Sequence, residues 1–326
     1  MPSTLQRSVL VTGGTIGLGY QCALAIARSC PTFQIIIASR TDNGAAETIN
    51  KLLNQDNTRF MSLDLSSLAN IRSFATTWKA ANLPPIYSLV LNAALQFPGA
   101  AEYTKDGFEK TFGINHVGHA LFFSLLRPHL ADTARVVITG SGTHDPAMKS
   151  GMPDAIYTTA EDLAHPPAKY TNSNGRQHYT NTKLANVLYM FALDRRFAAI
   201  NEKSGRHWTA TVMDPGLMPG TGLAREGNGI ERFLWKRVLP HIIPLLRLLL
   251  SDNVHTTRES GEALARLAVG KDVEGVSGRY FEGLREIPSS KDSLDEAKQE
   301  DLWRWTIDTV ARDEEKAAFS FEGLLQ

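Results

Sequence analysis

The chain has 326 residues, of which 43% are apolar and 21% are charged, as in an ordinary globular protein with a sizeable core. The 34 basic and 34 acidic side chains cancel, which argues against a generally basic nucleic-acid-binding protein and against an acidic disordered tail. The cysteines are only Cys22 and Cys30, so a disulfide scaffold is excluded and two reduced thiols are expected.

Short apolar runs alternate with longer amphipathic segments along the chain. The apolar runs have the length of buried strands and cover residues 8–12, 34–39, 59–63, 87–91, 134–139 and 208–213. The predicted helices cover residues 17–29, 45–54, 68–81, 107–130 and 179–199, and a further helix starts near residue 259. This alternation predicts an α/β fold with a doubly wound parallel sheet that has helices on both faces.

Two segments interrupt the alternation. Residues 142–177 are rich in Gly, Pro, Asn and Thr, which predicts a long surface excursion. Residues 216–251 lie between the sixth strand and the last predicted helix. Neither segment carries enough apolar residues for a core of its own, so a single domain over residues 1–326 is predicted.

A glycine-rich turn, Thr-Gly-Gly-Thr-Ile-Gly-Leu-Gly, joins the first strand to the first helix at residues 12–19. Its glycines at 13, 17 and 19 allow a sharp turn and close approach to a pyrophosphate, which the N-terminus of the next helix would face. A plain strand-to-helix turn is the alternative, but the position after the first strand favours dinucleotide binding. A nucleoside triphosphate loop fits poorly, because Tyr20 and Gln21 stand where Lys and Ser or Thr are required.

The end of the second predicted strand indicates which dinucleotide is bound. An Asp or Glu there would bind the 2′-hydroxyl of the adenosine ribose. This strand ends Ala38-Ser39-Arg40, without an acid, and the Arg40 guanidinium can bind a 2′-phosphate. NADP(H) is therefore predicted, with an ordinary solvated arginine as the alternative.

Among the eight tyrosines, Tyr179 alone has a lysine four residues later, at Lys183. On a helix these two side chains share a face, and an ammonium beside a phenol lowers a phenolic pKa that starts near 10. Such a phenol is a usable acid or base near neutral pH. A surface helix pair is the alternative for this spacing alone.

Other polar residues are predicted to meet at the same edge of the sheet. Asp64, Asn92, Ser141 and Pro215 each follow a predicted strand, and ligands of open α/β sheets bind at the carboxyl ends of the strands. Asn115 lies within the long predicted helix over residues 107–130. An amide in an apolar helix suggests a kink, a bound water or both, with a satisfied buried Asn as the plainer alternative.

Taken together, these motifs resemble the short-chain dehydrogenase/reductase superfamily over nearly the whole chain. TGGTIGLG is similar to its Thr-Gly-x-x-x-Gly-x-Gly turn, LNAA to its Asn-Asn-Ala-Gly loop, and Tyr179 and Lys183 to its catalytic pair. Ser141 and Asn115 match the remaining catalytic positions. The stretches DGFEKTFGINHVGH, YTNTKLANVLY and PGLMPGTGLAR resemble the branch of light-dependent protochlorophyllide reductases, retinol dehydrogenases and WW-domain oxidoreductases.

The resemblance implies a Rossmann-type fold and a role for each matching residue. Tyr179 would exchange the proton on the substrate oxygen, and Lys183 would lower its pKa and hold the nicotinamide ribose. Ser141 would hydrogen-bond the substrate carbonyl, and Asn115 would hold a water of a proton relay. The residues expected to contact the cofactor are Thr12, Gly13, Gly17, Leu18, Gly19, Arg40, Asp64, Asn92, Tyr179, Lys183, Pro215 and Met218.

Two departures limit what the resemblance implies. The loop reads Leu91-Asn92-Ala93-Ala94, so within it only Asn92 matches a functional position. Leu217 stands where protochlorophyllide reductases have a cysteine after Pro-Gly, so light-driven reduction is not implied.

The four histidines in and near the motifs lack metal-ligand spacing, so no metal is predicted and a structural or pocket-lining role is expected for His116, His119, His144 and His178.

The most apolar later stretch, residues 230–250, contains four basic residues and two prolines, so it is not predicted to span a membrane. Three alternatives stay open: a helix packed on the core, a mobile substrate cap, and a membrane-surface contact. The glycine turn begins by residue 13 and leaves no room for a signal peptide, so a cytoplasmic protein is expected, with peripheral membrane contact as an alternative.

The sequence therefore predicts an NADP(H)-dependent oxidoreductase that interconverts a carbonyl and an alcohol on a lipophilic or aromatic small molecule. Reduction of a conjugated C=C bond is one alternative. A non-catalytic NADP(H)-binding sensor or scaffold is another, which the presence of Tyr179 and Lys183 disfavours. No nucleic-acid partner is expected, and association into a homo-oligomer is left open.

Overall fold

A computed structural model describes residues 5–167, 175–221, 229, 233–249, 251–316, 319 and 321. Within these residues the strands form one eight-stranded sheet in the order β3-β2-β1-β4-β5-β6-β7-β8. Seven neighbouring strands run parallel, and the edge strand β8 is antiparallel to β7. The strands are β1 Arg7–Thr12, β2 Phe33–Ser39, β3 Thr58–Ser62, β4 Ile86–Leu91, β5 Leu130–Thr139, β6 His207–Asp214, β7 Arg279–Glu282 and β8 Arg285–Ile287.

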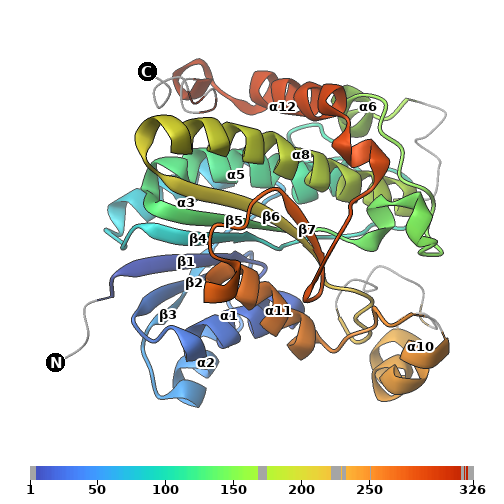
Figure 1. Cartoon of the computed structure of the whole chain (residues 1–326), viewed down its shortest axis with the longest axis horizontal. Coiled ribbons are helices and arrows are strands. Elements are labelled where there is room, and N and C mark those ends of the chain that lie inside the picture. Colours follow the sequence, from blue (N-terminus) through green and yellow to red (C-terminus); the bar gives the residue numbers. More distant parts are fainter. Residues whose placement is uncertain are drawn as a thin grey trace.

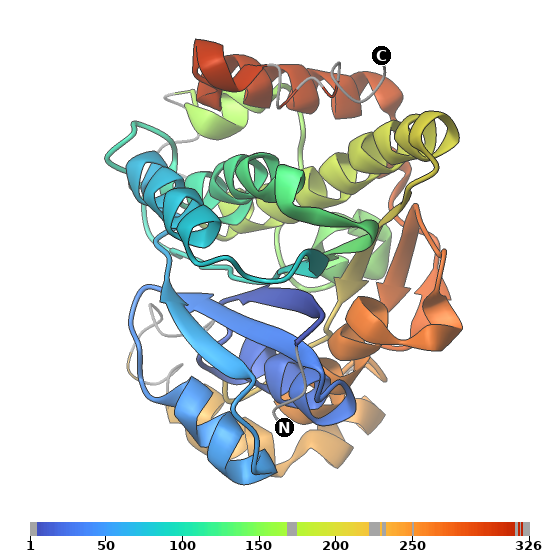
Figure 2. The same ribbon diagram turned by 90° about the vertical axis from the view of Figure 1, so that its left-hand side faces the viewer.

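Helices cover both faces of this sheet (Figures 1 and 2). One face carries α1 Gly17–Ser29, α2 Ala45–Leu53 and α11 Thr257–Val269. The other carries α3 Leu68–Ala80, α5 Gly118–Leu126 and α8 Gly175–Ser204, with α6 Ala160–Ala164 and α12 Glu296–Val310 outside them. The predicted doubly wound α/β fold is therefore confirmed.

The core lies in two layers, one on each side of the sheet. Leu10 and Ile36 belong to the layer under α3, α5 and α8, whereas Val11 and Ile37 belong to the layer under α1 and α11. This division follows from the two-residue period of a strand, and burial on both faces explains why the strands read as continuous apolar runs.

Strand order reverses between β1 and β4, because β1 pairs with β2 on one side and with β4 on the other. In a doubly wound sheet such a reversal opens a crevice at the carboxyl ends of the strands. The fold thus places the glycine turn after β1 and the loop after β4 beside each other.

The crossover from β4 to β5 is less regular than the single helix predicted over residues 107–130. It comprises α4 Lys110–Phe112, a π-helical turn at Gly113–Val117, α5, and a 3₁₀ turn at Arg127–His129. π-helical turns insert one extra residue into a helix and concentrate at functional sites. This turn contains Asn115, the amide that the sequence marks as unusual.

Among the described residues, no helix is long and apolar enough to cross a membrane. Cys22 and Cys30 are free thiols, and Cys22 is fully buried in the packing of α1.

Candidate active site

A cavity of about 1080 Å³ opens along the carboxyl ends of the parallel strands. Its walls come from the glycine turn, the ends of β2, β4, β5 and β6, the face of α8, and the segment after β6. Of the fourteen predicted site residues, Thr12 and Asn115 lie outside the wall, and the other twelve are Gly13, Gly17, Leu18, Gly19, Arg40, Asp64, Asn92, Ser141, Tyr179, Lys183, Pro215 and Met218. The fold therefore brings together residues that are 205 positions apart, from Gly13 to Met218.

The glycine turn has the backbone that a phosphate cradle needs. Gly13 and Gly17 have φ angles of 67° and 57°, which disfavour other residues. A Cβ on Gly19 would lie 2.4 Å from the Gly13 carbonyl oxygen, so glycine is required for the helix to pack this close to the turn. Helix α1 starts at Gly17 without a side-chain cap, which leaves its first N–H groups free toward the cavity.

Thr12 is fully buried behind this turn, and its hydroxyl has partners within the protein. Its hydroxyl oxygen accepts hydrogen bonds from the backbone N–H groups of Asn92 (2.8 Å) and Ala93 (3.0 Å). It also lies 2.9 Å from Nε2 of His119. Thr12 thus holds the loop after β4 against the glycine turn. Its buried position outside the cavity wall gives no support to the expected direct contact with a cofactor.

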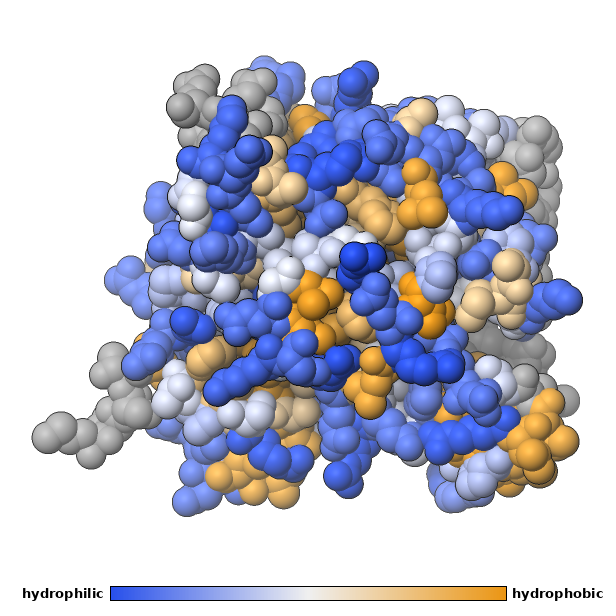
Figure 3. Space-filling model, viewed as in Figure 1, coloured by the Kyte–Doolittle hydropathy of each residue, from blue (hydrophilic) through white to orange (hydrophobic). Residues whose placement is uncertain are grey.

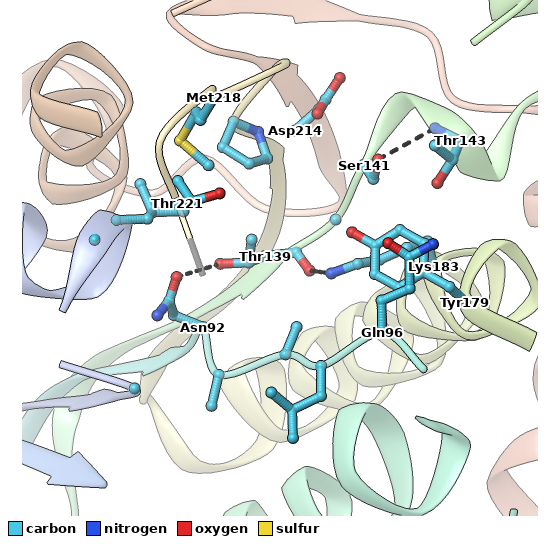
Figure 4. Close-up of a pocket in the computed structure, with 18 of the residues that line it drawn as sticks. Asn92, Gln96, Thr139, Ser141, Thr143, Tyr179, Lys183, Asp214, Met218 and Thr221 are labelled. Atoms are coloured by element: carbon cyan, nitrogen blue, oxygen red, sulfur yellow. Dashed lines mark hydrogen bonds between the residues drawn. The ribbon is translucent and has the colours of Figure 1, made fainter. Parts of the chain in front are cut away.

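Asn92 connects three neighbouring strand ends. Its Nδ2 donates to the Thr12 carbonyl at 2.8 Å, and its Oδ1 accepts from the Thr139 hydroxyl at 3.4 Å. The side chain fixes the floor of the cavity between the glycine turn and β5 (Figure 4).

The ends of β2 and β3 form the side of the cavity where an adenosine would lie. Ser39 accepts a hydrogen bond from the Thr15 hydroxyl at 3.1 Å, and Arg40 beside it is exposed at the wall. Asp64 also lies at the wall, and its Oδ1 accepts from the N–H and hydroxyl of Ser66. The exposed Arg40 cation and the hydrogen-bonded Asp64 carboxylate therefore both line this side of the cavity.

Tyr179 and Lys183 occupy successive turns of α8 and both reach the cavity wall (Figure 4). Their side chains are nearly buried, at 6% and 1% exposure. Lys183 Nζ donates to the Thr139 carbonyl at 3.0 Å and lies 5.4 Å from the centre of the Tyr179 ring. Thr139, which sequence reasoning missed, thus orients the lysine from the end of β5.

The two pKa values move in the directions that burial dictates. Burial raises the pKa of Tyr179, the nearby Asp214 carboxylate raises it further, and a hydrogen bond with Ser141 partly offsets both. Burial also lowers the pKa of Lys183 to about 8, while Asp214 acts in the opposite sense. Lys183 is not among the causes of the Tyr179 shift, so the expected lowering of this pKa by Lys183 stays a prediction.

Ser141 begins a short 3₁₀ turn, Gly142–His144, directly after β5. Its hydroxyl accepts a hydrogen bond from the Thr143 N–H at 3.3 Å, and its side chain also hydrogen-bonds with Tyr179. The side chains of Ser141 and Tyr179 therefore lie near each other in the cavity wall, where both can reach a substrate oxygen.

Asn115 lies behind the wall in the π-helical turn. Its Oδ1 accepts from the Leu95 N–H at 2.8 Å, and its Nδ2 donates to the Leu95 carbonyl at 2.9 Å and to the Thr182 hydroxyl at 3.3 Å. Its main-chain carbonyl lies 3.1 Å from Nδ1 of His119. The side chain thus fixes the loop that lines the cavity, and the carbonyl keeps a second lone pair for a further donor.

The four singled-out histidines do not line the cavity. His116, His119, His144 and His178 are all buried, and burial lowers the pKa of His116 to about 3 and of His119 to about 4. His144 connects the Ser141 carbonyl to the Ser290 N–H. Three of these side chains therefore make internal hydrogen bonds, in keeping with a structural role.

In the part of the chain that the structure describes, no three His, Cys, Asp or Glu side chains come together as a metal site.

The segment after β6 forms the far wall of the cavity. Leu217 bridges to Val254, with hydrogen bonds of 2.8 Å from the Leu217 N–H to Asn253 and of 2.9 Å from the His255 N–H to Leu217. We call residues 233–249 the cap. Its Leu234, Trp235 and Leu239 line the cavity.

The cap packs separately from the main core. Ile243 and Leu246 of α10 Ile243–Leu249 are buried with Val254 in a cluster apart from both layers of the sheet. This packing favours a cap over a helix packed on the main core, and the choice among the three alternatives for this stretch stays a prediction. Ile230, which the sequence groups with this stretch, lies outside the described residues.

Comparison with known proteins identifies the family. A family described as short chain dehydrogenase matches residues 7–159, and one described as AcuH dehydrogenase domain matches residues 225–319. Human polyprenol dehydrogenase is 31% identical over 314 residues, which cover 93% of this chain and 84% of that protein. The chain belongs to the short-chain dehydrogenase/reductase superfamily.

Two further comparisons concern the predicted branch and the fold. Protochlorophyllide reductase of Daucus carota is 31% identical over 312 residues, covering 90% of this chain and 74% of that protein. An uncharacterized protein from Mycobacterium Paratuberculosis shares the fold, with a TM-score of 0.63, 23% identity and 95% of each chain covered. The chain is thus a short-chain dehydrogenase/reductase of the branch that its motifs indicate, in a superfamily of oxidoreductases.

Proposed function

We propose that this short-chain dehydrogenase/reductase interconverts a carbonyl and an alcohol on a lipophilic small molecule with NADP(H). One observation carries the proposal: Tyr179 and Ser141 lie near Lys183 in the wall of a cavity that the glycine turn and Arg40 also line. An acid/base group and a dinucleotide cradle thus share one space.

The chain's residues fit the dinucleotide. The uncapped N-terminus of α1, with Gly17 open on its cavity side, suits a pyrophosphate, since a Cβ on Gly17 would meet nothing within 4 Å. Arg40 would bind a 2′-phosphate. NADP(H), when bound, supplies or accepts the hydride, and its oxidised nicotinamide adds a positive charge that favours the Tyr179 phenolate.

The protein's own groups then handle the proton and the developing charge. Tyr179 gives a proton to the substrate oxygen in reduction and takes it back in oxidation. Ser141 donates to the same oxygen as negative charge develops on it. Lys183, held by the Thr139 carbonyl, supplies the ammonium that stabilises a Tyr179 phenolate, and we retain the expectation that a relay water binds the Asn115 carbonyl.

The proposal predicts a cofactor preference that depends on Arg40. Arg40→Ala should weaken NADPH binding by about 1.5–3 kcal/mol, because one charge-assisted contact to the 2′-phosphate is lost. NADH lacks that phosphate, so its affinity should stay unchanged. Fluorescence titration of both cofactors checks this, with Arg28→Ala at the far end of α1 as a control. An equal loss for NADPH and NADH would remove the basis for choosing NADP(H).

A lipophilic substrate suits the apolar side of the cavity. The apolar residues that line it include Leu95, Met152, Leu217, Leu234 and Trp235. The human relative's name, polyprenol dehydrogenase, also favours a lipid alcohol or the matching carbonyl compound. Purified protein should therefore oxidise NADPH with some members of a panel of lipophilic aldehydes, ketones and enones, and inactivity across the whole panel would oppose the proposal.

Reduction of a conjugated C=C bond stays a second candidate, because protochlorophyllide reductase is as similar in sequence as polyprenol dehydrogenase. Leu217 at the position of that family's cysteine weighs against the photochemical reaction. A cofactor-binding scaffold without chemistry is disfavoured by the buried, hydrogen-bonded Lys183 beside Tyr179.

The cap should change its exchange behaviour when ligands bind. Ile243 and Leu246 of its α10 pack in a small cluster with Val254, Leu239 and Ile242, apart from both core layers, so α10 should open at a lower free energy than α8. We expect fast amide exchange in residues 233–249 in the free protein and slower exchange with NADPH and a substrate analogue bound. Hydrogen-exchange mass spectrometry measures this, and strong protection without ligand would instead indicate a fixed helix.

The outer face of the cap exposes apolar side chains at the lower right of Figure 3. Leu248 and Leu249 of α10 are 81% and 69% exposed, and Phe233 is 61% exposed. This surface is what a membrane-surface contact beside the cavity mouth would need, so peripheral contact remains part of the proposal.

A further inference from the structure

A buried carboxylate that the proposed mechanism does not use lies at the end of β6. Asp214 is 3% exposed, ends a strand that is buried after its first residue, and lines the cavity next to Pro215 (Figure 4). A buried charge is costly unless several donors satisfy it, so its partners show what it holds in place.

Three donors from three different segments converge on this carboxylate. The Gly216 N–H donates to Oδ1 at 2.9 Å, and Asn253 Nδ2 donates to Oδ2 at 2.8 Å. The backbone of Gly142 supplies a third hydrogen bond. Burial raises the pKa of Asp214 and the neighbouring Glu282 adds to this rise, whereas the three N–H donors oppose it and favour the ionised form.

The three segments are those that shape the active site. Gly142 follows Ser141, Gly216 opens the segment that leads to the cap, and Asn253 lies where the chain returns from it. The fit is tight, because a Cβ on Gly142 would lie 3.1 Å from Oδ2 of Asp214. Asp214 therefore joins the Ser141 turn to the base of the cap.

The charge of Asp214 also acts on the catalytic pair. It raises the pKa of both Tyr179 and Lys183. The other titratable groups that face it are Glu282, Tyr280 and His255. Glu282 lies opposite Asp214 in the β6–β7 register and forms an ion pair with Arg285, so its charge has a partner of its own.

We propose that Asp214 is a positioning residue, which holds the Ser141 turn and the base of the cap together and keeps a negative charge beside Tyr179 and Lys183. This inference rests on the proposed function for its catalytic meaning. Lys183 and Asp214 then act on the Tyr179 phenol in opposite directions, and the balance between them sets the pH range in which the site works.

Asp214→Asn tests the charge with little change of shape. Removing the charge should lower the phenol titration midpoint of Tyr179 in the NADP⁺ complex by about one pH unit. Ultraviolet titration of phenolate absorbance measures this, with the matching Tyr179→Phe protein subtracted because the chain has eight tyrosines. The pH profile of alcohol oxidation should move to lower pH on both limbs, because the pKa of Lys183 also falls.

A matched variant separates the charge from the contacts. Asn253→Ala removes one donor to Asp214 and keeps the charge, so it should raise KM for a lipophilic substrate and leave the pH profile near that of the wild type.

If Asp214→Asn does not fold, Asp214→Ser removes the same charge with a smaller side chain. An unchanged or higher Tyr179 midpoint in a folded, charge-free variant would overturn the inference. The phenolate titration needs no turnover, so a wild-type protein inactive on every substrate would count against the proposed function and leave this test standing.

Discussion

Tyr179→Phe should lower turnover by about 10²–10⁴-fold while the fold and NADPH affinity persist. The change removes the single hydroxyl that exchanges a proton with the substrate oxygen. The ring stays in place, and its packing on α8 is retained because Tyr179 is 6% exposed. Steady-state kinetics, circular dichroism and NADPH titration together measure these three properties.

Tyr189→Phe is the matched control for that substitution. Tyr189 is also buried on α8 and packs against Trp303, but it does not line the cavity. Its variant should retain turnover. If Tyr179→Phe kept wild-type turnover on a verified substrate, another group would have to be the proton donor.

Lys183→Met should have the second-largest effect, a loss of about 10²-fold in alcohol oxidation at neutral pH. An opposite charge nearby lowers a phenolic pKa by roughly one to three units, and each unit is worth about tenfold in the phenolate fraction. The variant removes the ammonium and keeps most of the side-chain volume. A pH series of kcat/KM checks this, and we expect the acid limb to move to higher pH.

The alkaline limb gives a second readout for the same lysine. The pKa of Lys183 is lowered to about 8, so the wild-type rate should fall as the pH rises through this value and the ammonium is lost. Lys183→Met should lack that fall. An alkaline limb that survives in the variant would mean that another group titrates there. The acid limb should shift in the opposite direction from the one expected for Asp214→Asn.

Much of the fold is predictable from the sequence because local patterns and tertiary structure agree. The first helix is predicted at residues 17–29 and found at Gly17–Ser29, since the glycine turn marks its start. The strands over residues 8–12 and 34–39 are each found one residue longer at their N-terminal ends. A parallel sheet buried on both faces leaves continuous apolar runs, which are easy to recognise.

The sequence pattern is less informative beyond the sixth strand. Strands β7 and β8 span four and three residues, too short for a clear apolar period, and the sequence does not predict α12. The sequence also predicts one continuous helix where the structure has the irregular crossover around Asn115. Its π-helical turn depends on tertiary contacts, in which Asn115 bonds the backbone of Leu95.

The candidate site also contains both residues that the sequence predicts and residues that it does not. Glycines, Tyr179, Lys183 and Ser141 stand at recognisable spacings, so their convergence could be predicted. Thr139 acts through its carbonyl, which no side-chain pattern reveals. Asp214 had a usable signal, a charge at the end of an apolar strand directly before Pro215, but its partners Gly142 and Asn253 come from distant segments.

The most direct test of the central proposal follows the hydride itself. Purified protein is incubated with a lipophilic α,β-unsaturated carbonyl compound and NADPH that carries deuterium at the transferred position, and the product is examined by NMR. Carbonyl reduction predicts deuterium on the alcohol carbon of a product that keeps its C=C bond, and loss of this product with Tyr179→Phe. Deuterium on a carbon of the former C=C bond would contradict carbonyl reduction and establish the alternative reaction.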